Sequence, residues 1–460
     1  MRVVVCVKET QGELSPFDQS AVECALEISD DVTVISMGRP SAEEVLLRLT
    51  RLGCKAVLLT DTSFAGADTL ATAYALSLAI KDLAPDLIIC GRQSIDGDTA
   101  QTGPALATML GCSLAANVMD FKASEGAITV TTRQGEAELT YPALITVERI
   151  RNLRFPKLRS KLGEVQKLSA DDIGADKSRC GLKGSPTRVM KTFESAVGKR
   201  KCKFIKPNQL DEVIKESLAK RAEQLAPTVS DTPLPLVWCV GDEVVPAAKT
   251  VAKEVKVIAR DSAQNLAKII KDGKPEFVLW PADLWGRCVA PQVQAMLDTG
   301  LCADCTALET DGKDLFMYRP AYSGTLTAKI RCATRPAMAT VRLANGGDAD
   351  IILSCGKGVK DFLPQMEQYA KSIGAQLAGS RGIVDAGFMP YSAQIGLTGR
   401  NVASAVYIAA GISGAVHHTC ALDRVGTVIA INPDKDARIF EYADYGIIAN
   451  AEDVFGIKGE

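Results

Sequence analysis

The strongest constraint on the fold of this chain is a regular alternation of short apolar, β-branched runs with amphipathic helical patterns. The helical patterns lie at Ser41–Leu52 and Thr69–Lys81. The apolar runs between and around them predict buried strands at Val3–Val7, Val32–Ile35, Ala56–Leu59, Leu87–Cys90 and Ala143–Val147. Strands that alternate with helices in this way predict an α/β fold whose parallel sheets are covered by helices.

The chain is long enough for several domains. At about 150 residues per domain, its 460 residues predict three. We expect an α/β domain over residues 1–165, a charged connector over 166–232 with one helix at Gln209–Leu225, a second α/β domain over 233–345, and a third over 346–460. Gly346 and Gly347 stand between the last two domains and are either a hinge or an ordinary turn.

Composition excludes several classes of function. The net charge of −2 gives no electrostatic reason to expect nucleic acid or an anionic membrane as a partner, and no apolar stretch reaches 18 residues. Fourteen cysteines scattered through apolar strands are typical of a reducing compartment, so we expect a cytoplasmic protein. Cys302 and Cys305 form a C-x-x-C pair, which is either structural, a redox pair or half of a zinc site. No second pair stands at ligand spacing, and we expect no metal site.

Polar residues lie at the ends of three predicted strands near the C-terminal end of the sequence. Val406–Ala410 runs through Gly411 to Ser413, Thr427–Ile431 ends in Asn432, and Asp444 precedes another apolar run. Ligands of open α/β sheets bind at such strand ends, and a helix opened by Ser413 would offer free N–H groups to a pyrophosphate. A glycine-rich turn alone is also compatible with a tight turn that binds nothing.

The same region carries a family resemblance. Residues 379–387, 394–399 and 407–418, followed in order by 430–432 and 443–446, resemble the FAD domain of the α subunit of electron transfer flavoproteins. Residues 300–305, 319–324 and 335–342 resemble the first domain of that subunit. The resemblance implies that the C-terminal domain is a Rossmann-like FAD-binding domain.

The front of the chain resembles the β subunit of the same family. The matching phrases are residues 36–38, 64–72, 90–104 and 180–188. The resemblance therefore implies one polypeptide in which a β part precedes an α part.

For the C-terminal site, the resemblance implies specific roles. Arg381, Thr398 and His418 would carry the redox chemistry, with the Thr398 hydroxyl at N5 of the flavin and positive charge from Arg381 and His418 at the N1–C2=O edge. Leu397 and His417 stand where the family commonly has glutamine. The other expected FAD contacts are Gly356, Lys357, Ser380, Gln394, Gly396, Gly399, Ser413, His417, Asn432 and Asp444.

The N-terminal site is expected at the turn 96–104, which follows a strand and opens a helix. The family divides here, since one branch holds AMP and the electron-bifurcating branch holds a second FAD reduced by NADH. The phrases at 96–101 and 181–186 resemble the bifurcating branch, although AMP remains the alternative. The expected contacts are Cys6, Ser15, Met37, Asp68, Thr72, Gly97, Thr99, Gln101 and Thr102.

A basic loop around Leu158 resembles the segment through which the β part docks its partners. It is either that docking loop, with Leu158 as apolar anchor, or an ordinary solvated loop. The expected partner is a flavin-containing dehydrogenase such as an acyl-CoA dehydrogenase, or another oxidoreductase. The expected function is electron transfer through FAD, with bifurcation. The alternatives are a one-FAD carrier with structural AMP and a non-redox adenine-nucleotide-binding scaffold.

Overall fold

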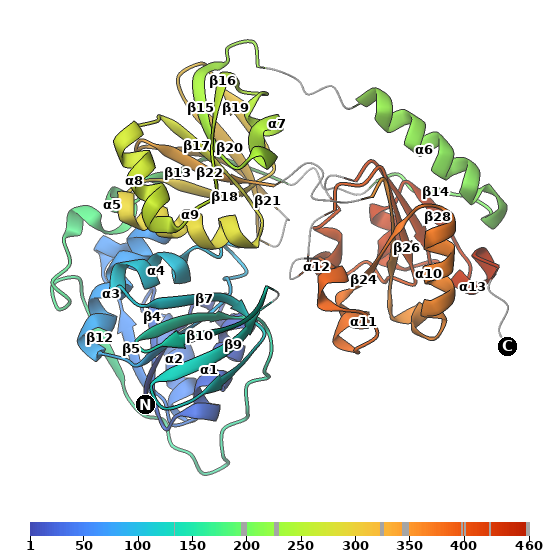
Figure 1. Ribbon diagram of the computed structural model, residues 1–460. Coiled ribbons are helices and arrows are strands. Elements are labelled where there is room, and N and C mark those ends of the chain that lie inside the picture. Colours follow the sequence, from blue (N-terminus) through green and yellow to red (C-terminus); the bar gives the residue numbers. More distant parts are fainter. Residues whose placement is uncertain are drawn as a thin grey trace. The chain divides into compact units, whose positions relative to one another are not determined.

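The computed structural model describes residues 1–132, 134–194, 200–224, 230–322, 326–342, 349–396, 399, 402–422 and 425–456. The chain divides into two compact units (Figure 1). Unit 1 comprises Met1–Thr192, Val229–Tyr322 and Ala328–Arg342, and unit 2 comprises Phe193–Thr228, Ser323–Thr327 and Leu343–Glu460. Among the described helices, none combines the length and the apolar character needed to cross a membrane.

The N-terminal part of unit 1 is built on a seven-stranded sheet whose neighbouring strands all run parallel. The chain order reverses between β1 and β6, which lie side by side, and ligands of open α/β sheets bind outside the carboxyl ends of strands at such a reversal. The strands, in spatial order, are β12 (Val165–Leu168), β5 (Lys55–Leu59), β4 (Asp31–Met37), β1 (Arg2–Cys6), β6 (Leu87–Gly91), β11 (Ala143–Val147) and β7 (Ser113–Val118).

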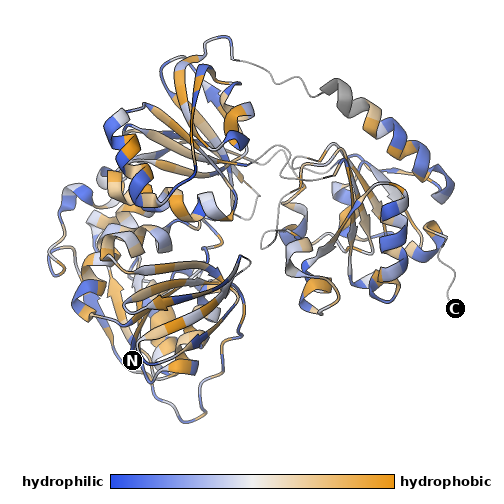
Figure 2. Ribbon diagram, in the orientation of Figure 1, coloured by the Kyte–Doolittle hydropathy of each residue, from blue (hydrophilic) through white to orange (hydrophobic). Residues whose placement is uncertain are grey.

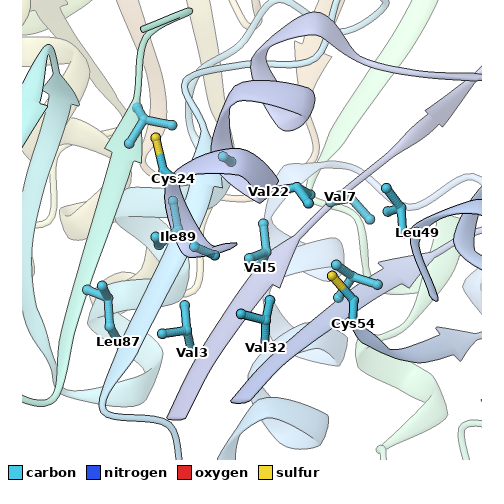
Figure 3. Close-up of a cluster of buried hydrophobic side chains, with 14 of the residues drawn as sticks. Val3, Val5, Val7, Val22, Cys24, Val32, Leu49, Cys54, Leu87 and Ile89 are labelled. Atoms are coloured by element: carbon cyan, nitrogen blue, oxygen red, sulfur yellow. The ribbon is translucent and has the colours of Figure 1, made fainter. Parts of the chain in front are cut away.

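Helices cover both faces of this sheet because alternate strand residues point to opposite sides. Val3 and Val5 of β1 pack with α1 (Pro16–Ile28) and α2 (Ala42–Thr50), as Figure 3 shows for part of the cluster. Val4 and Cys6 pack on the other face with α3 (Thr69–Leu83) and α4 (Thr102–Leu110). The strands are accordingly coloured mostly as hydrophobic in Figure 2.

Smaller elements complete the N-terminal part. A three-stranded antiparallel sheet contributes Ile128 and Val130 to the same core as Val3. It consists of β10 (Gly135–Thr140), β9 (Ala127–Thr132) and β8 (Asp120–Ala123), and the hairpin after β1 consists of β2 (Glu9–Thr10) and β3 (Glu13–Leu14).

The second part of unit 1 holds a five-stranded parallel sheet and a four-stranded sheet. Helix α9 of this part packs against α4, so the two parts of the unit share an interface. The parallel sheet has the order β16 (Ala252–Ile258), β15 (Leu234–Val240), β17 (Phe277–Pro281), β22 (Ala337–Val341) and β18 (Leu301–Cys305). Its helices are α7 (Val245–Ala248), α8 (Ala263–Gly273) and α9 (Leu284–Leu297), and the other sheet has the order β13 (Thr187–Glu194), β21 (Leu326–Cys332), β20 (Leu315–Ala321) and β19 (Ala307–Thr310).

Unit 2 contains a second seven-stranded parallel sheet. Leu353 and Cys355 of β23 pack with α6 (Leu210–Gln224) and α10 (Leu363–Ser372), and Ile352 faces the opposite cluster. The strand order is β14 (Lys203–Phe204), β28 (Tyr445–Ile447), β27 (Thr427–Ile431), β26 (Val406–Ala410), β23 (Ile351–Cys355), β24 (Gln376–Ser380) and β25 (Gln394–Ile395). The chain order therefore reverses between β23 and β26. The short helices are α11 (Arg381–Asp385), α12 (Val416–Thr419) and α13 (Ala451–Val454).

The predicted α/β fold with helix-covered parallel sheets is confirmed. The stretch expected as a connector is more structured than its charged sequence suggests. It supplies strands to three sheets, through β12, β13 and β14, as well as the one-turn helix α5 (Gly181–Gly184) and the predicted helix, which is α6. Gly346 and Gly347 lie outside the described residues.

Candidate functional site

The C-terminal candidate site lies at the carboxyl ends of β23 and β26, where the chain order reverses. Gly356 and Lys357 directly follow β23, and Ser413 follows β26. A Cβ added at Gly356 would lie 2.0 Å from the carbonyl oxygen of Gly411, so the two strand ends approach each other through backbone alone. This places a lysine, a serine hydroxyl and the backbone of both strand ends at one edge of the sheet.

Two cations meet at this edge. A Cβ at Gly382 would lie 3.0 Å from Cε of Lys357, so the lysine side chain runs alongside the first turn of α11, next to Arg381. Nε of Arg381 bonds Oδ2 of Asp385 at 2.9 Å, and Ser380 precedes it at the end of β24. Two cations against one carboxylate, with two serine hydroxyls, form a donor set that suits a phosphate-bearing ligand.

His418 lies inside the unit. It is 6% exposed, and its Nε2 lies 2.6 Å from the hydroxyl of Tyr407 on β26. Burial lowers the pKa of His418 to about 4, so the ring is neutral near pH 7. The family resemblance implies a positive charge on this residue. The structure differs because the charged imidazole would lose its hydration on burial, and the sequence around His418 does not reveal that burial.

The helix expected to open at Ser413 is a single turn. It begins at Val416, after Ala415, and ends at Thr419. A helix of one turn adds little to the dipole at its start. A ligand at exposed Ser413 would therefore meet its hydroxyl and local N–H groups rather than a strong helix end. Gly414 has φ of +88° and packs its Cα against η7 (Arg438–Tyr442), which fixes the turn.

Two further predicted contacts make structural bonds. Nδ2 of Asn432 donates to the carbonyl of Ile412 at 3.0 Å, which ties the end of β27 to the end of β26. Oδ2 of Asp444 accepts the N–H of Val428 at 2.8 Å and pairs with Arg200. Asn432 is thus at the crevice edge, whereas Asp444 joins neighbouring strands.

The remaining predicted FAD contacts surround β25. Gln394 is buried at the start of this strand, and a Cβ at Gly399 would lie 2.2 Å from its carbonyl oxygen. Gly396, with φ of +132°, packs against the carbonyl of His417, which is an exposed residue of α12. Leu397 and Thr398 lie outside the described residues.

The N-terminal candidate site lies at the matching reversal between β1 and β6. Asp18 of α1 fills the space between the two strand ends. Its Oδ2 accepts the N–H of Lys8 at 2.9 Å, and a Cβ at Gly91 would lie 2.3 Å from its Oδ1. Desolvation raises the pKa of Asp18 to about 7, although the N–H of Lys8 opposes the shift. Nζ of Lys8 in turn bonds Oδ2 of Asp96 at 2.6 Å.

Sequence reasoning missed Asp18 and Lys8. One signal was available, because Asp18 occupies the apolar stripe of α1 together with Ala21, Val22 and Ala25. A carboxyl on the buried face of a helix is costly and marks a functional site by default. Lys8 carried no comparable signal, since it only follows a strand.

The turn 96–104 has the strained backbone of a binding loop. Asp98 and Ala100 have φ of +50° and +55°. The carbonyl of Gly97 accepts a bond of 2.6 Å from Arg319, and Gln101 donates to the carbonyl of Leu301 at 3.2 Å. The second part of unit 1 therefore holds the turn in place. Thr99 lies within it, and Thr102 begins α4.

The other predicted N-terminal contacts also gather at the carboxyl edge. Cys6 ends β1, Met37 ends β4, and Ser15 precedes α1. The hydroxyls of Ser15 and Ser36 are buried and have no hydrogen-bond partner among the described residues, as expected of an edge that fits a polar ligand.

Asp68 and Thr72 lie at the start of α3. Asp68 caps this helix and accepts two bonds from Thr187, so its carboxylate is occupied by the protein itself. Thr72 lies one turn further along the helix.

Cys302 and Cys305 are both buried in β18, and burial raises the pKa of the Cys305 thiol well above its usual value. Asp304 lies between them and pairs with Arg287 at 2.5 Å and Arg342 at 2.7 Å. Burial acts to raise the pKa of Asp304, but these arginines together outweigh it and hold the pKa below its usual range. The C-x-x-C pair is thus embedded in a charged interior.

Two strand reversals in parallel sheets, each with hydroxyl-bearing residues at its carboxyl edge, are typical of α/β proteins of the nucleotide-binding class. The electron transfer flavoprotein domain matches residues 3–173 and 247–346, and the electron transfer flavoprotein FAD-binding domain matches residues 347–423. The chain therefore belongs to the electron transfer flavoprotein family, with β-like and α-like parts in one polypeptide.

Individual relatives match one part each. The electron transfer flavoprotein subunit alpha of Thermoanaerobacterium thermosaccharolyticum is 35% identical over a 234-residue alignment that covers 41% of this chain and 71% of the relative. The electron transfer flavoprotein subunit beta of Megasphaera elsdenii is 41% identical over a 201-residue alignment that covers 39% of this chain and 74% of the relative. The protein FixA of Azorhizobium caulinodans is 37% identical over a 248-residue alignment that covers 45% of this chain and 88% of the relative.

Proposed function

We propose that this electron transfer flavoprotein holds FAD in both crevices, takes electrons from NADH at the N-terminal one, and bifurcates them between two acceptors. The observation that carries the proposal is the presence of two ligand-type strand reversals in one chain, each with its own polar lining. A bound flavin supplies reversible uptake of one or two electrons. The protein supplies binding, orientation and charge.

At the C-terminal crevice, Lys357, Ser380 and Ser413 would hold the pyrophosphate. Arg381 would stabilise the negative charge that reduction places on the ring, because it is the cation fixed at this edge by Asp385. His418, neutral and bonded to Tyr407, would act as a hydrogen-bonding group rather than as a second cation. Thr398 keeps its proposed place at N5 through the family resemblance.

At the N-terminal crevice, the hydroxyls of Ser15, Thr99 and Thr102 and the backbone of the turn 96–104 would hold the phosphate end of the nucleotide. Arg319 supports the proposal because it fixes that turn through the carbonyl of Gly97. The N–H groups of the turn are then held in place before the ligand binds, which reduces the entropic cost of binding.

The second candidate is a one-FAD carrier with AMP at the N-terminal crevice. One feature of the described geometry favours this candidate. The turn and the buried serines would contact only the phosphate end of the nucleotide, which FAD and AMP share. A non-redox nucleotide-binding scaffold is the third candidate, and a colourless purified protein would favour it.

Counting nucleotides released per chain tests the proposal. We expect two FAD, no AMP, and rapid bleaching of one flavin by NADH. Replacing Thr99 and Thr102 together with valine should remove one FAD and abolish NADH oxidation. Thr108→Val is the matched control, because this α4 hydroxyl donates to the carbonyl of Pro104 and lies outside the turn. One FAD with one AMP, and no bleaching, would leave the one-FAD carrier.

We also propose that the loop around Leu158 docks a flavin-containing dehydrogenase or another oxidoreductase. Phe155 and Leu158 are 94% and 98% exposed, and Lys157 and Arg159 flank them. Large apolar side chains held in solvent between cations fit a partner surface with an apolar pocket and a carboxylate rim.

A further inference from the structure

Unit 1 contains a pocket of about 220 Å³ that belongs to neither crevice. It lies between helix α3, the segment 178–188 and the loops after α9 and β21. The side chains that matter for its chemistry are Tyr74, Arg179, Lys183, Arg188 and Asp298, and Thr334 also lines it. The predicted nucleotide contact Thr72 stands two residues before Tyr74 on α3. Two residues rotate the direction of a side chain by about 200° around the helix axis, so Thr72 lies on another side of the helix.

The pocket carries excess positive charge. Arg179 is held by Asp298 at 3.1 Å, and its guanidinium lies 4.2 Å from the ring centroid of Tyr74. Lys183 and Arg188 form no ion pair with the described residues. Three cations therefore face a single carboxylate, which is an arrangement that a bound anion would stabilise.

The wall that presents these cations is firmly built. The N–H of Asp68 donates to Oγ of Ser185 at 2.7 Å, and the carboxylate of Asp68 accepts the N–H and the hydroxyl of Thr187 at 3.0 and 2.6 Å. A Cβ at Gly184 would lie 2.0 Å from the backbone of Arg179, so this turn admits only glycine. A site whose framework is fixed before binding loses less entropy when the ligand arrives.

Size limits the ligand. A water molecule takes about 30 Å³ of liquid volume, and pockets for drug-sized molecules begin at roughly 300 Å³. The pocket is therefore too small for a dinucleotide and large enough for a small polyatomic anion. Arginine forks match the oxygens of phosphate in pairs, so Arg179 and Arg188 suit such an anion.

We propose that this pocket binds a phosphate group, either as inorganic phosphate or as the head of a small phosphate monoester. The ligand would touch the segment 178–188 of the β-like part and the loops that carry Asp298 and Thr334 of the α-like part. Its binding should therefore stabilise unit 1 as a whole, because a ligand that binds only the folded state raises the free energy of unfolding.

Calorimetric titration of inorganic phosphate into the full chain, loaded with its nucleotides, tests the site. We expect saturable binding of one phosphate per chain, weakened about tenfold or more in Lys183→Ala and in Arg188→Ala, each of which removes one charged donor. Lys177→Ala is the matched control, since this lysine of the same segment pairs with Asp171 and does not line the pocket.

Titrations with glycerol phosphate and with succinate identify the class of anion that binds. Tighter binding of glycerol phosphate than of inorganic phosphate would identify a monoester as the ligand, and the reverse order would identify the free ion. Equal binding of succinate would overturn phosphate selectivity. No saturable heat with any phosphate, or equal weakening in Lys177→Ala, would overturn the site. Unchanged nucleotide content and melting of each variant without phosphate establish that the fold is intact.

Discussion

At the scale of single residues, the two crevices hold titratable groups with opposite pKa shifts and the same physical cause. Asp18 and His418 are both removed from water, and burial penalises the charged form of each. The carboxyl therefore keeps its proton to higher pH, and the imidazole loses its proton at lower pH. Two pH dependences of opposite sign follow.

Asp18 should make unit 1 less stable as pH rises. Its pKa is about 7 in the folded chain against 3.8 in a free side chain, so its stabilising contribution is complete below about pH 4 and is lost as pH rises through 7. In Asp18→Asn this slope should be absent. The measurement is the urea unfolding free energy of unit 1 from pH 4 to 8. A slope unchanged from the parent would show that Asp18 is not the titrating group, and Asp30→Asn, an exposed carboxyl, serves as the control.

His418 should make unit 2 sensitive to acid. Its pKa falls from 6.5 to about 4 on folding, so the stability that it contributes is present above pH 6.5 and is lost as pH falls toward 4. We expect FAD release, followed by flavin fluorescence, to begin within this interval in the parent. In His418→Gln, release should begin at lower pH. His417→Gln changes the exposed neighbour and should behave as the parent. Release at one common pH in all three proteins would contradict the prediction.

At the scale of elements, the periodic segments could be predicted from the sequence and the short ones could not. The runs at 143–147 and 427–431 are strands with the predicted bounds, because buried strands of a parallel sheet are continuously apolar. Strand β14 has only two residues and no alternation of apolar and polar side chains, so its pairing with β28 alone makes it a strand. The charged residues around it led to the prediction of a connector.

The candidate sites show the same division. Glycines, hydroxyls and strand-end positions such as Ser413 and Asn432 could be placed at the crevice from the sequence, because strand ends meet at one edge. The pairing of Lys8 with Asp96 spans 88 residues and depends on the sheet order, which no local pattern contains. The neutral state of His418 depends likewise on its burial against Tyr407.

The loop around Leu158 permits a prediction at this scale. Leu158→Ala should weaken binding of the proposed partner dehydrogenase by about 1–3 kcal/mol, because a single buried anchor contributes about this amount at an interface. Electron transfer to that partner should slow accordingly. Stopped-flow kinetics over a range of partner concentrations measure the change, with FAD content unaltered. Leu236→Ala, a leucine 39% exposed elsewhere in unit 1, is the control. Identical kinetics for Leu158→Ala and the parent would leave Leu158 in an ordinary solvated loop.

At the scale of the whole molecule, each unit has its own hydrophobic clusters and its own crevice. Residues that share one hydrophobic core unfold together, so a chain with separate cores does not unfold in a single transition. We expect two calorimetric transitions. Because the proposed function places FAD in both crevices, added FAD should raise the transitions of both units, each by about 2.7 kcal/mol at 100 times the dissociation constant of its site.

Inorganic phosphate should raise only the transition of unit 1, because its proposed pocket lies there. Limited proteolysis during the melt identifies which unit unfolds at each step. A single transition that shifts as one under both ligands would show that the units unfold together.

The early position of β14 and α6 in the chain has a consequence for synthesis. Strand β14 belongs to the C-terminal sheet and α6 packs on it, yet β28, the strand that β14 pairs with, lies about 240 residues further on. At 5–20 residues per second the ribosome takes about 12–50 s to make that interval. Until β23 and β26 are made, Leu210, Val213 and Ile214 of α6 lack the strands that later bury them. The nascent chain therefore presents an unpaired strand and an uncovered helix face to the cell, and a chaperone that binds this segment would act before the flavin-binding half exists.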